Sequence, residues 1–356
     1  MSGYLRPALG ILKWVIALGI LSYLVVDNRT HFERLITEPI HWQFLVVAFA
    51  LCGGATVLTF VRWYILVVAL DFPFRFADAL RLGFMGCLFN YVGPGGVGGD
   101  LVKAVLMARE QHGRRSVAVA TILLDRILGL VGLLLVGAAA SLVVVDGVEH
   151  RDEIVTILWG GSIAGLTGLL VMLHPATPKA WWMTKLTHIP KVGRIVADVA
   201  GGISLYQKRK SVLAIAVAMS VVSHLGLISS FYCCTLVVST QAETLSFTMN
   251  LLLFPLAQFV GFIVPVPGGV GALEGAVQEL FKLAGGNPGI SLLAAGAYRL
   301  TQVLIAAIGS VYYLASRRQI QKLLAEEQAA LESPPSDSTL GESLATAQTS
   351  TAQPET

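Results

Sequence analysis

Charged side chains inside long apolar runs are the residues of this sequence best suited to do chemistry. Asp125 and Arg126 lie in ATILLDRILGLVGLLL, and Arg299 lies in AAGAYRLTQVLIAAI. An ionisable residue at the centre of a bilayer costs about 2.5–3.5 kcal/mol on insertion scales, so such residues usually have a function. A guanidinium is a planar, two-pronged donor that matches phosphate oxygens. The two arginines therefore point to the binding of an anionic group, most simply a phosphate.

Each of these runs follows a corner rich in glycine and proline. Pro-Gly-Gly-Val-Gly occurs at 94–98 and again at 267–271, and an acid follows each copy, Asp100 or Glu274. The arginine of each run lies 32 residues after the proline of its copy. A shared pentapeptide of small residues is weak evidence alone, but the equal arginine offset indicates a duplicated structural unit.

The two corners could bind an anion through their backbone as well as through the arginines. A helix start leaves N–H groups unpaired and carries about half a positive charge, and glycine lets an anion come close. We expect a basic cavity in which the acids pair with the arginines when no ligand is bound. The expected substrate-binding residues are Arg126, Arg299, Asp100, Glu274, Lys103, Asn90, Asp125, Gly95, Gly96, Gly98, Gly99, Gly268, Gly269 and Gly271.

Some of these residues also have structural interpretations. Asp100 and Glu274 suit the first turn of a helix, which favours acids. Asp125 and Arg126 are adjacent and lie about 100° apart around a helix, so they do not pair with each other. They could instead join a structural ion network with Asp100 or Lys103. These structural roles stay open beside the binding role.

Other polar residues of the apolar runs are expected to be structural. Arg62 precedes two aromatic residues and is interpreted as an anchor at the cytoplasmic interface. Asn90 is expected to satisfy broken backbone. His224 is interpreted as a hydrogen-bonded packing residue, and Gln258 and Gln302 as hydrogen-bonding groups between helices.

Composition and hydropathy indicate an integral membrane protein. Of 356 residues, 55% are hydrophobic and 13% are charged, against about 25% charged in soluble domains, and the mean hydropathy is +0.71. Six apolar segments reach the length that crosses a bilayer, about 20 residues. They are 9–26, 43–66, 117–145, 154–173, 212–238 and 291–316, and two shorter, broken segments surround 76–108 and 248–286.

Charges between the spans predict which side each loop faces, because Lys and Arg stay on the cytoplasmic side. Segment 174–211 holds seven basic residues and one acid, so we expect a basic cytoplasmic loop, whereas the acidic loop 146–153 is expected outside. If each long segment crosses once, both termini are inside, provided that each broken segment returns to the side it entered from. The broken segments are then re-entrant hairpins or pairs of short spans.

Three spans separate the two broken segments, so the two copies point in opposite directions. Repeat one covers about 43–145 and repeat two about 212–316, within a polytopic region 1–320 that is followed by a disordered tail at 325–356. Inverted repeats with interrupted helices are typical of transporters, with the site near the midplane where the broken ends meet. We therefore predict an all-α integral membrane protein with about six full spans and two broken helical hairpins in an inverted repeat.

The sequence lacks patterns for other chemistries. GPGGVG at 93–98 formally matches G-x-G-x-x-G, but it follows an apolar helix rather than a strand, so no dinucleotide site is expected. The four cysteines lie in apolar runs without metal-ligand spacing. We expect no catalytic residue, cofactor, metal ion or nucleic acid partner. The loop 174–211 is compatible with contact to a protein partner, and a homo-oligomer is a further option.

Four stretches together resemble a known family: RWYILVVAL, FNYVGPGGVGGDLVKAVLMAR, ATILLDRILGL and PVPGGVGALEG. They look like the transmembrane region of the lysylphosphatidylglycerol synthase family, also called the flippase-like group, over about 5–320. In long members this region flips an aminoacylated lipid, and stand-alone relatives are associated with moving or handling other lipids. The resemblance implies the same here. Fewer than 40 residues follow position 320, so we do not expect the synthase activity. Lys103 stands where the family commonly has arginine, which keeps the charge but loses the forked geometry.

The leading hypothesis from the sequence is a multi-pass lipid translocase of the inner, cytoplasmic membrane. Arg126 and Arg299 would bind the phosphate of a lipid head group, while Asp100 and Glu274 compete for them. No ATP site is expected, so movement is downhill or coupled to an ion gradient. Two alternatives stay open. One is an ion-coupled carrier of a small anion, whose cavity would be closed to lipid. The other is an accessory subunit or an enzyme that acts on a lipid-linked substrate.

Overall fold

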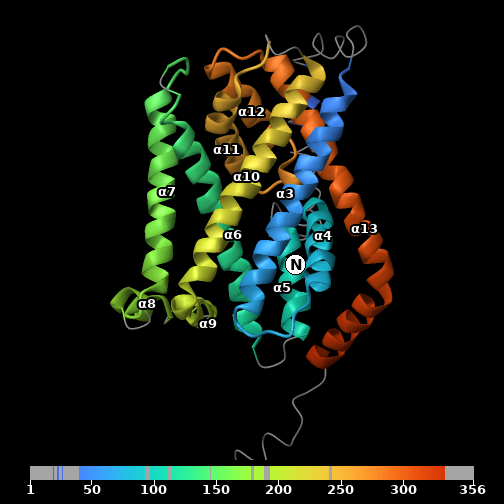
Figure 1. Cartoon of the computed structure of the whole chain (residues 1–356). Helices are drawn as coiled ribbons and strands as arrows, with labels where there is room; N and C mark the ends of the chain where they lie inside the picture. Colours follow the sequence, from blue (N-terminus) through green and yellow to red (C-terminus); the bar gives the residue numbers. More distant parts are fainter. Residues whose placement is uncertain are drawn as a thin grey trace, which may run out of the picture. The chain divides into compact units, whose positions relative to one another are not determined.

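Long apolar helices make up most of the fold, because the chain has few charged residues with which to cover a soluble surface (Figure 1). In the computed structural model, every regular element of the described residues is helical. Five of the described helices are long and apolar enough to cross a membrane. They are α3 (Trp42–Val68), α6 (Arg115–Ala140), α7 (Arg151–Leu173), α10 (Lys210–Val238) and α13 (Pro288–Glu332, apolar over Pro288–Ala315).

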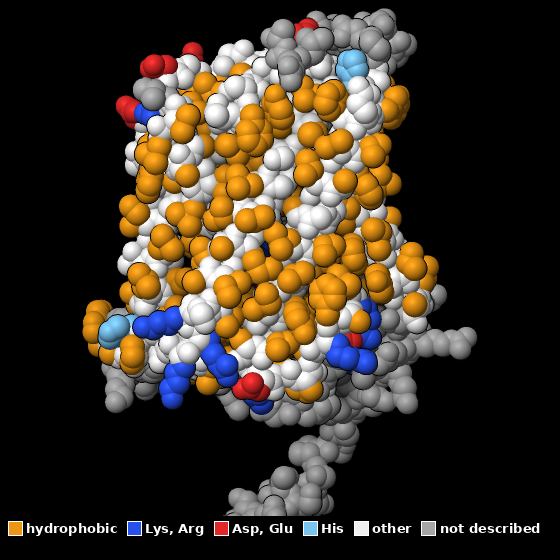
Figure 2. Space-filling model, viewed as in Figure 1, with side chains coloured by type: hydrophobic (Ala, Val, Ile, Leu, Met, Phe, Trp, Pro, Cys, Tyr) orange, Lys and Arg blue, Asp and Glu red, His pale blue; other side chains and the backbone are white. Residues whose placement is uncertain are grey.

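These helices confirm the prediction of an all-α membrane protein and match five of the six predicted spans. On the face viewed in Figure 2, apolar side chains cover the middle, and most of the visible Lys and Arg lie near the lower end. The remaining predicted span, 9–26, lies almost wholly outside the described residues. The structure describes residues 40–92, 97–110, 114–144, 146–177, 180–187, 193–239 and 243–332, and also positions 19, 22, 23 and 26.

The chain divides into two units, residues 1–310 and 311–356. The second unit begins within α13, which continues to Glu332. Residues 325–332 are therefore helical rather than part of the predicted tail, because LLAEEQAALE consists of strong helix formers. The rest of that tail lies outside the described residues. The hairpins, the core and the cavity all belong to the first unit.

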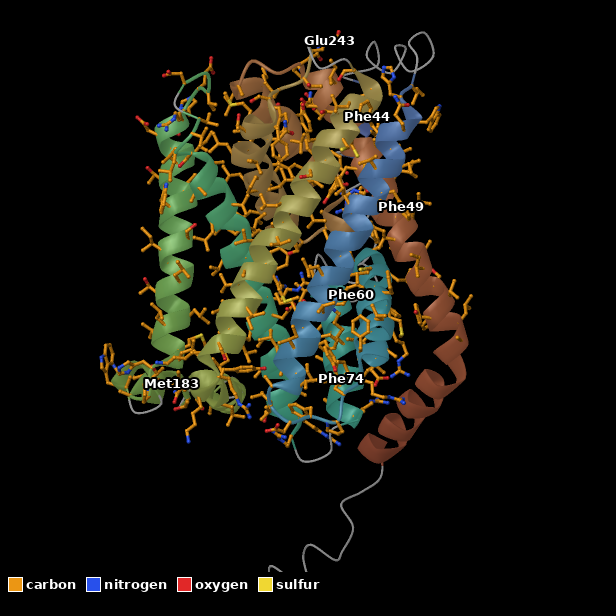
Figure 3. All side chains as sticks on the ribbon, viewed as in Figure 1. Phe44, Phe49, Phe60, Phe74, Met183 and Glu243 are labelled. Atoms are coloured by element: carbon orange, nitrogen blue, oxygen red, sulfur yellow. The ribbon has the colours of Figure 1, made fainter. Side chains whose placement is uncertain are left out.

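Two helical hairpins enter the first unit from opposite ends (Figure 1). The ends can be followed in Figure 3: Phe74, just before the first hairpin, lies near one end of α3, and Glu243, just before the second, lies at the opposite end. This is the inverted arrangement that an odd number of intervening spans predicts. The first hairpin is α4 (Phe76–Val92) and α5 (Gly98–Glu110), and the second is α11 (Phe247–Ile263), η4 (Pro267–Gly269) and α12 (Ala272–Leu283).

The first hairpin contacts the corner of the second. Tyr91, near the end of α4, packs so closely on Gly268 of the second corner that a Cβ there would lie 2.6 Å from the tyrosine ring. Gly268 also has φ +60°, a left-handed conformation that glycine adopts without strain. Glycine is therefore required at this position both by its own backbone and by the ring of the opposite hairpin.

Much of the predicted basic loop 174–211 is helical and packs against the span helices. The Tyr206 hydroxyl donates to the Leu66 carbonyl at 2.7 Å, and burial raises the pKa of this tyrosine. A Cβ on Gly202 would lie 2.5 Å from the Cβ of Ala120 in α6. The segment is thus a helical cap on α3 and α6. Its elements are α8 (Trp181–Thr187), α9 (Gly193–Ser204) and η3 (Leu205–Lys208).

A cluster of fully buried aromatic rings joins α10, α11, α12 and α13. Phe231 stacks on Phe254 with ring centroids 4.0 Å apart, and it meets Phe281 and Tyr298 edge to face. Aromatic pairs of this kind add about 0.5–1.5 kcal/mol each beyond their burial. Both helices of the second hairpin are therefore fixed to a well-packed core.

Candidate functional site

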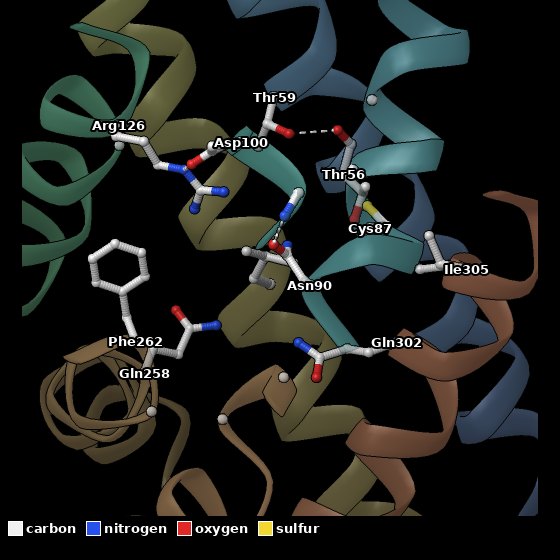
Figure 4. Close-up of a pocket in the computed structure, with 18 of the residues that line it drawn as sticks. Thr56, Thr59, Cys87, Asn90, Asp100, Arg126, Gln258, Phe262, Gln302 and Ile305 are labelled. Carbon is white, nitrogen blue, oxygen red and sulfur yellow. Dashed lines mark hydrogen bonds and ion pairs between the residues drawn. The ribbon is translucent and has the colours of Figure 1, made fainter. Parts of the chain in front are cut away.

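A cavity of about 360 Å³ lies between the two hairpins (Figure 4). This volume falls within the range of small-ligand sites, about 300–1,000 Å³. Helices of both repeats form the wall, and among the described residues no cluster of His, Cys, Asp and Glu could hold a metal ion. The lining includes these residues predicted from the sequence: Arg126, Arg299, Asp100, Lys103, Asn90, Asp125, Gly99, Gly268 and Gly269.

The other predicted residues do not line the cavity directly. Glu274 reaches it only through Arg299, to which it is bonded. Gly98 begins α5, Gly271 caps the start of α12, and both lie outside the lining. Gly95 and Gly96 lie outside the described residues. Among the described residues, the cavity is therefore lined mainly by side chains of the helices, together with Gly268 and Gly269 of the second corner.

The first ion pair joins the start of α5 to α6. Arg126 Nε donates to Asp100 Oδ2, and Lys103 Nζ lies 3.8 Å from the other oxygen of that carboxylate. The Arg126 guanidinium also lies over the Phe262 ring, 5.6 Å from its centroid, as Figure 4 shows. The Arg126 side chain is 35% exposed and that of Asp100 is 11% exposed. Arg126 is thus held by one carboxylate and keeps an exposed side.

The second ion pair is enclosed and has more partners. Arg299 Nε donates to Glu274 Oε1 at 2.7 Å, and its two Nη atoms donate to the carbonyl oxygens of Gly268 and Gly269 at 2.6 and 3.2 Å. Glu274 Oε2 accepts the Gly271 N–H at 2.8 Å, so the acid also caps α12. The Arg299 and Glu274 side chains are only 14% and 3% exposed. This pair holds the shape of the second corner.

A third ion pair was missed, because the aromatic residues after Arg62 suggested an anchor at the interface. That prediction is wrong: Arg62 is 4% exposed and lines the cavity. Its Nε donates to Asp125 Oδ1 at 2.7 Å, and its Nη2 donates to the Asp125 carbonyl oxygen at 3.1 Å. The run WYILVVAL after Arg62 is the signal that could have placed the arginine inside the span.

Several backbone N–H groups at the corners are used within the protein. Asn90 Oδ1 accepts the Gly99 N–H at 2.9 Å, which confirms that Asn90 satisfies broken backbone. The N–H groups of Gly269 and Val270 donate to nearby carbonyl oxygens, and that of Gly271 donates to a carboxylate. These amides are therefore not the free anion donors that the sequence suggested, and the cavity offers side-chain donors instead.

His224 and Gln258 also line the cavity, which their sequence positions did not reveal. His224 Nε2 lies 2.9 Å from the Gly129 carbonyl oxygen, and Gln258 Nε2 donates to the Tyr298 hydroxyl at 3.2 Å. These contacts confirm the predicted hydrogen bonds of both residues. Gln302 instead accepts from an arginine of its own helix. Polar side chains on several spans are a general sign of an internal cavity, and this signal could have found the two residues.

The fold and the cavity define a multi-pass α-helical membrane protein with an ion-paired, polar cavity between two opposed hairpins. The family model of the lysylphosphatidylglycerol synthase TM region matches residues 10–309. The chain belongs to this family, and the match confirms the resemblance of its four sequence stretches. Comparisons with curated proteins and with solved structures gave no match.

Proposed function

We propose that this protein is a lipid translocase, which moves the head group of an anionic lipid through the cavity while the lipid tails stay in the bilayer. Family membership and the membrane-spanning helices support a lipid-related role. The cytoplasmic membrane is the proposed location, with the basic segment 174–211 on the cytoplasmic side. The observation that carries the proposal is the exposed side of Arg126.

A lateral opening distinguishes a lipid translocase from a carrier of a soluble anion. Among the described residues, α5 and α11 both pack against α6 but barely touch each other. Arg126 contacts both of these helices, and its side chain is 35% exposed. Exposed apolar side chains lie near this ion pair. Leu101 follows Asp100 in the sequence, Leu123 precedes Arg126 by about one helical turn, and the Phe262 ring contacts the Arg126 guanidinium. Lipid tails can cover such a surface while the head group reaches the guanidinium.

The charges of the cavity favour an anionic ligand. Its described lining residues, taken with the acid that pairs with Arg299, comprise four cations and three carboxylates, which leaves one positive charge. One phosphodiester carries the matching single negative charge. The charged residues are Arg62, Lys103, Arg126, Arg299, Asp100, Asp125 and Glu274.

The two ion pairs related by the repeat, Asp100–Arg126 and Glu274–Arg299, have different roles in the proposed cycle. The guanidinium of Arg299 is fully engaged with the second corner, so the phosphate binds Arg126 rather than both arginines. It takes the place of Asp100, and one charge-assisted hydrogen bond is exchanged for another. The released carboxylate stays near Lys103, 3.8 Å away, and returns to Arg126 when the phosphate leaves. This exchange uses no nucleotide, so movement follows the lipid gradient or is coupled to an ion.

Vesicles that contain the purified protein test this proposal. They carry an anionic phosphodiester lipid with a fluorescent head group, and a membrane-impermeant reductant destroys the dye in the outer leaflet. Wild-type protein is expected to expose the inner-leaflet dye, whereas Arg126→Gln should slow this exposure by about tenfold or more, the equivalent of one charge-assisted hydrogen bond. Arg75→Gln is the matched control, because the Arg75 side chain is 87% exposed.

Two outcomes contradict the proposal. In the first, the wild-type vesicles lose no more dye than protein-free vesicles. In the second, the Arg126→Gln and Arg75→Gln variants expose the inner-leaflet dye at equal rates. Uptake of labelled inorganic phosphate into the same vesicles without dye exposure would favour the carrier of a soluble anion instead.

A further inference from the structure

A histidine of α10 lies among the ion pairs of the cavity. His224 lines the cavity, and its Nε2 lies 2.9 Å from the Gly129 carbonyl oxygen in α6. A carbonyl only accepts, so Nε2 carries the hydrogen and Nδ1 keeps a lone pair. Histidine is the side chain that ordinarily gains or loses its charge near neutral pH. His224 is therefore a candidate proton-binding group on the path proposed for the lipid head group.

The Gln258 side chain of α11 lies within hydrogen-bonding reach of His224 and can pair with it in either protonation state. Gln258 lines the cavity (Figure 4), and its Nε2 donates to the Tyr298 hydroxyl at 3.2 Å, which leaves Oε1 to accept a proton from His224 Nδ1. When Nδ1 is bare, a half turn of the amide brings Nε2 to His224. Tyr298 then donates to Oε1, because a hydroxyl both donates and accepts. The histidine can therefore gain or lose a proton without leaving a buried polar group unpaired.

The helices that pack against α10 determine which charges face His224. α11 has no charged or titratable residue between Phe247 and Ile263, and η3 adjoins the start of α10, about 20 Å of helix away from His224. The other charged or titratable residues that these helices and α13 bring to the described cavity or to Gln258 are Cys52 and Arg62 from α3, Asp125 and Arg126 from α6, and Tyr298 and Arg299 from α13.

These charges make the proton of His224 depend on a bound anion. The Arg62 guanidinium lies near enough to repel an imidazolium, and the described charges of the cavity already leave one positive charge over. A second positive charge on His224 is therefore unfavourable before an anion binds. One phosphodiester at Arg126 removes the excess, so the anion favours the proton and, by thermodynamic reciprocity, the proton favours the anion.

We propose that His224 binds a proton together with the anionic head group and thereby couples lipid movement to the proton gradient. This inference rests on the proposed function and names its coupling ion. One proton and one head group with a single negative charge cross together, so the step moves no net charge and a pH difference alone can drive it. The lipid then accumulates in the leaflet that faces the more alkaline side.

Vesicles with a pH difference across the membrane test the coupling. The purified protein is placed in a zwitterionic bilayer with a trace of the dye-labelled anionic lipid, and a potassium ionophore with equal potassium on both sides holds the membrane potential at zero. The membrane-impermeant reductant reports the share of dye in each leaflet. With a difference of about one pH unit, wild-type protein should enrich the lipid about tenfold in the leaflet on the alkaline side, the equivalent of one proton per lipid. Protein-free vesicles under the same gradient give the background, and reversing the gradient should reverse the enrichment.

The variant His224→Gln locates the proton. Its amide keeps a donor for the Gly129 carbonyl but does not titrate, so it should still move the lipid at equal pH and lose the pH-driven enrichment. His174→Gln is the matched control, because His174 is an exposed histidine outside this cavity, and it should enrich the lipid like wild type. A second readout needs no transport. Wild-type protein in weakly buffered detergent should take up protons near neutral pH when the anionic lipid is added, whereas folded His224→Gln should not.

The outcomes separate this inference from the proposed function. If wild-type protein moves the lipid at equal pH but distributes it equally under either gradient, proton coupling is overturned and lipid translocation stands. If His224→Gln enriches the lipid as wild type does, or takes up the same protons, another group carries the proton and the inference fails. If wild-type protein moves no lipid at any pH, the proposed function and the coupling fail together.

Discussion

The two hairpins carry the same acid and arginine but hold them differently. Each acid is in the first turn of the second helix of its hairpin, and each arginine is in the following span. Glu274 and Arg299 are enclosed, and Arg299 also holds two carbonyl oxygens of its corner. In the first pair Asp100 is buried, but the Arg126 side chain is 35% exposed and has an aromatic neighbour, Phe262. A duplicated motif has thus become a fixed wall in one repeat and a pair that can open in the other.

Packing around the hairpins explains this difference. The second hairpin is joined to the aromatic cluster of Phe231, Phe254, Phe281 and Tyr298, which fixes both of its helices. In the first hairpin, α5 packs on α4 and α6 and, within the described part of the chain, has few or no contacts with α11. A ligand can therefore approach the first pair without disturbing a core, whereas an approach to the second pair would break one.

Replacing Arg299 should give the largest effect on stability. Arg299→Gln leaves Glu274 without its cation in an enclosed site, and loss of one partner of a buried ion pair costs about 3–5 kcal/mol. The melting temperature of detergent-purified protein measures the effect. The double variant Glu274→Gln/Arg299→Gln removes the lone charge and should be more stable than the single variant. A stability of Arg299→Gln close to wild type would contradict the fixed role of this pair.

Replacing a corner glycine should give the next largest effect. Gly268→Ala adds a Cβ at positive φ and against the Tyr91 ring, with an expected cost of about 1–2 kcal/mol for the backbone and about 1–3 kcal/mol for overpacking. Gly285→Ala is the matched control, because Gly285 has φ +71° but nothing within 4 Å of its added Cβ. Thermal unfolding of both variants measures the difference. Equal losses of stability in the two variants would show that the contact between Tyr91 and the second corner is not tight.

Replacing Arg126 should affect stability less than replacing Arg299. Arg126→Gln leaves the buried Asp100 carboxylate beside Lys103, which still offsets part of its charge, so the expected cost is about 1–3 kcal/mol, that of one lost hydrogen-bond partner. The same melting experiment measures it. If Arg126→Gln and Arg299→Gln lowered the melting temperature equally, the contrast between the two hairpins would be lost.

Replacing Phe262 should give the smallest effect. Phe262→Leu keeps an apolar side chain but removes the ring beneath the Arg126 guanidinium, and cation–π contacts at exposed sites contribute about 0.5–1 kcal/mol. The stability of Phe262→Leu is therefore expected to lie between wild type and Arg126→Gln. A larger loss than that of Arg126→Gln would place Phe262 in a core rather than at an opening.

Much of this fold was predictable because membranes impose simple rules on sequence. Apolar runs of sufficient length predicted the five described spans, and the interruptions by Gly and Pro predicted the two hairpins. The predicted pairing of Asp100 and Glu274 with the arginines is also found, because acids inside a membrane need partners. The continuation of α13 to Glu332 was not predicted, because the polar residues that precede the Pro- and Ser-rich end suggested a tail.

The remaining features depend on contacts between distant segments. Arg62 and Asp125 are 63 residues apart, so local sequence could not show that they pair. The unequal exposure of Arg126 and Arg299 arises from neighbouring helices, not from the motif that both follow. Free amides were expected at both corners, but those of Gly269 and Gly271 are bonded within the second corner. The periodic pattern of a sequence carries none of this information.

Native mass spectrometry of gently purified protein tests the binding role of Arg126 most directly. The wild-type protein and Arg75→Gln should retain a phosphodiester lipid that carries one negative charge, whereas Arg126→Gln should lose it while remaining folded. Retention of the same lipid by folded Arg126→Gln, at the level of the wild type, would contradict the account.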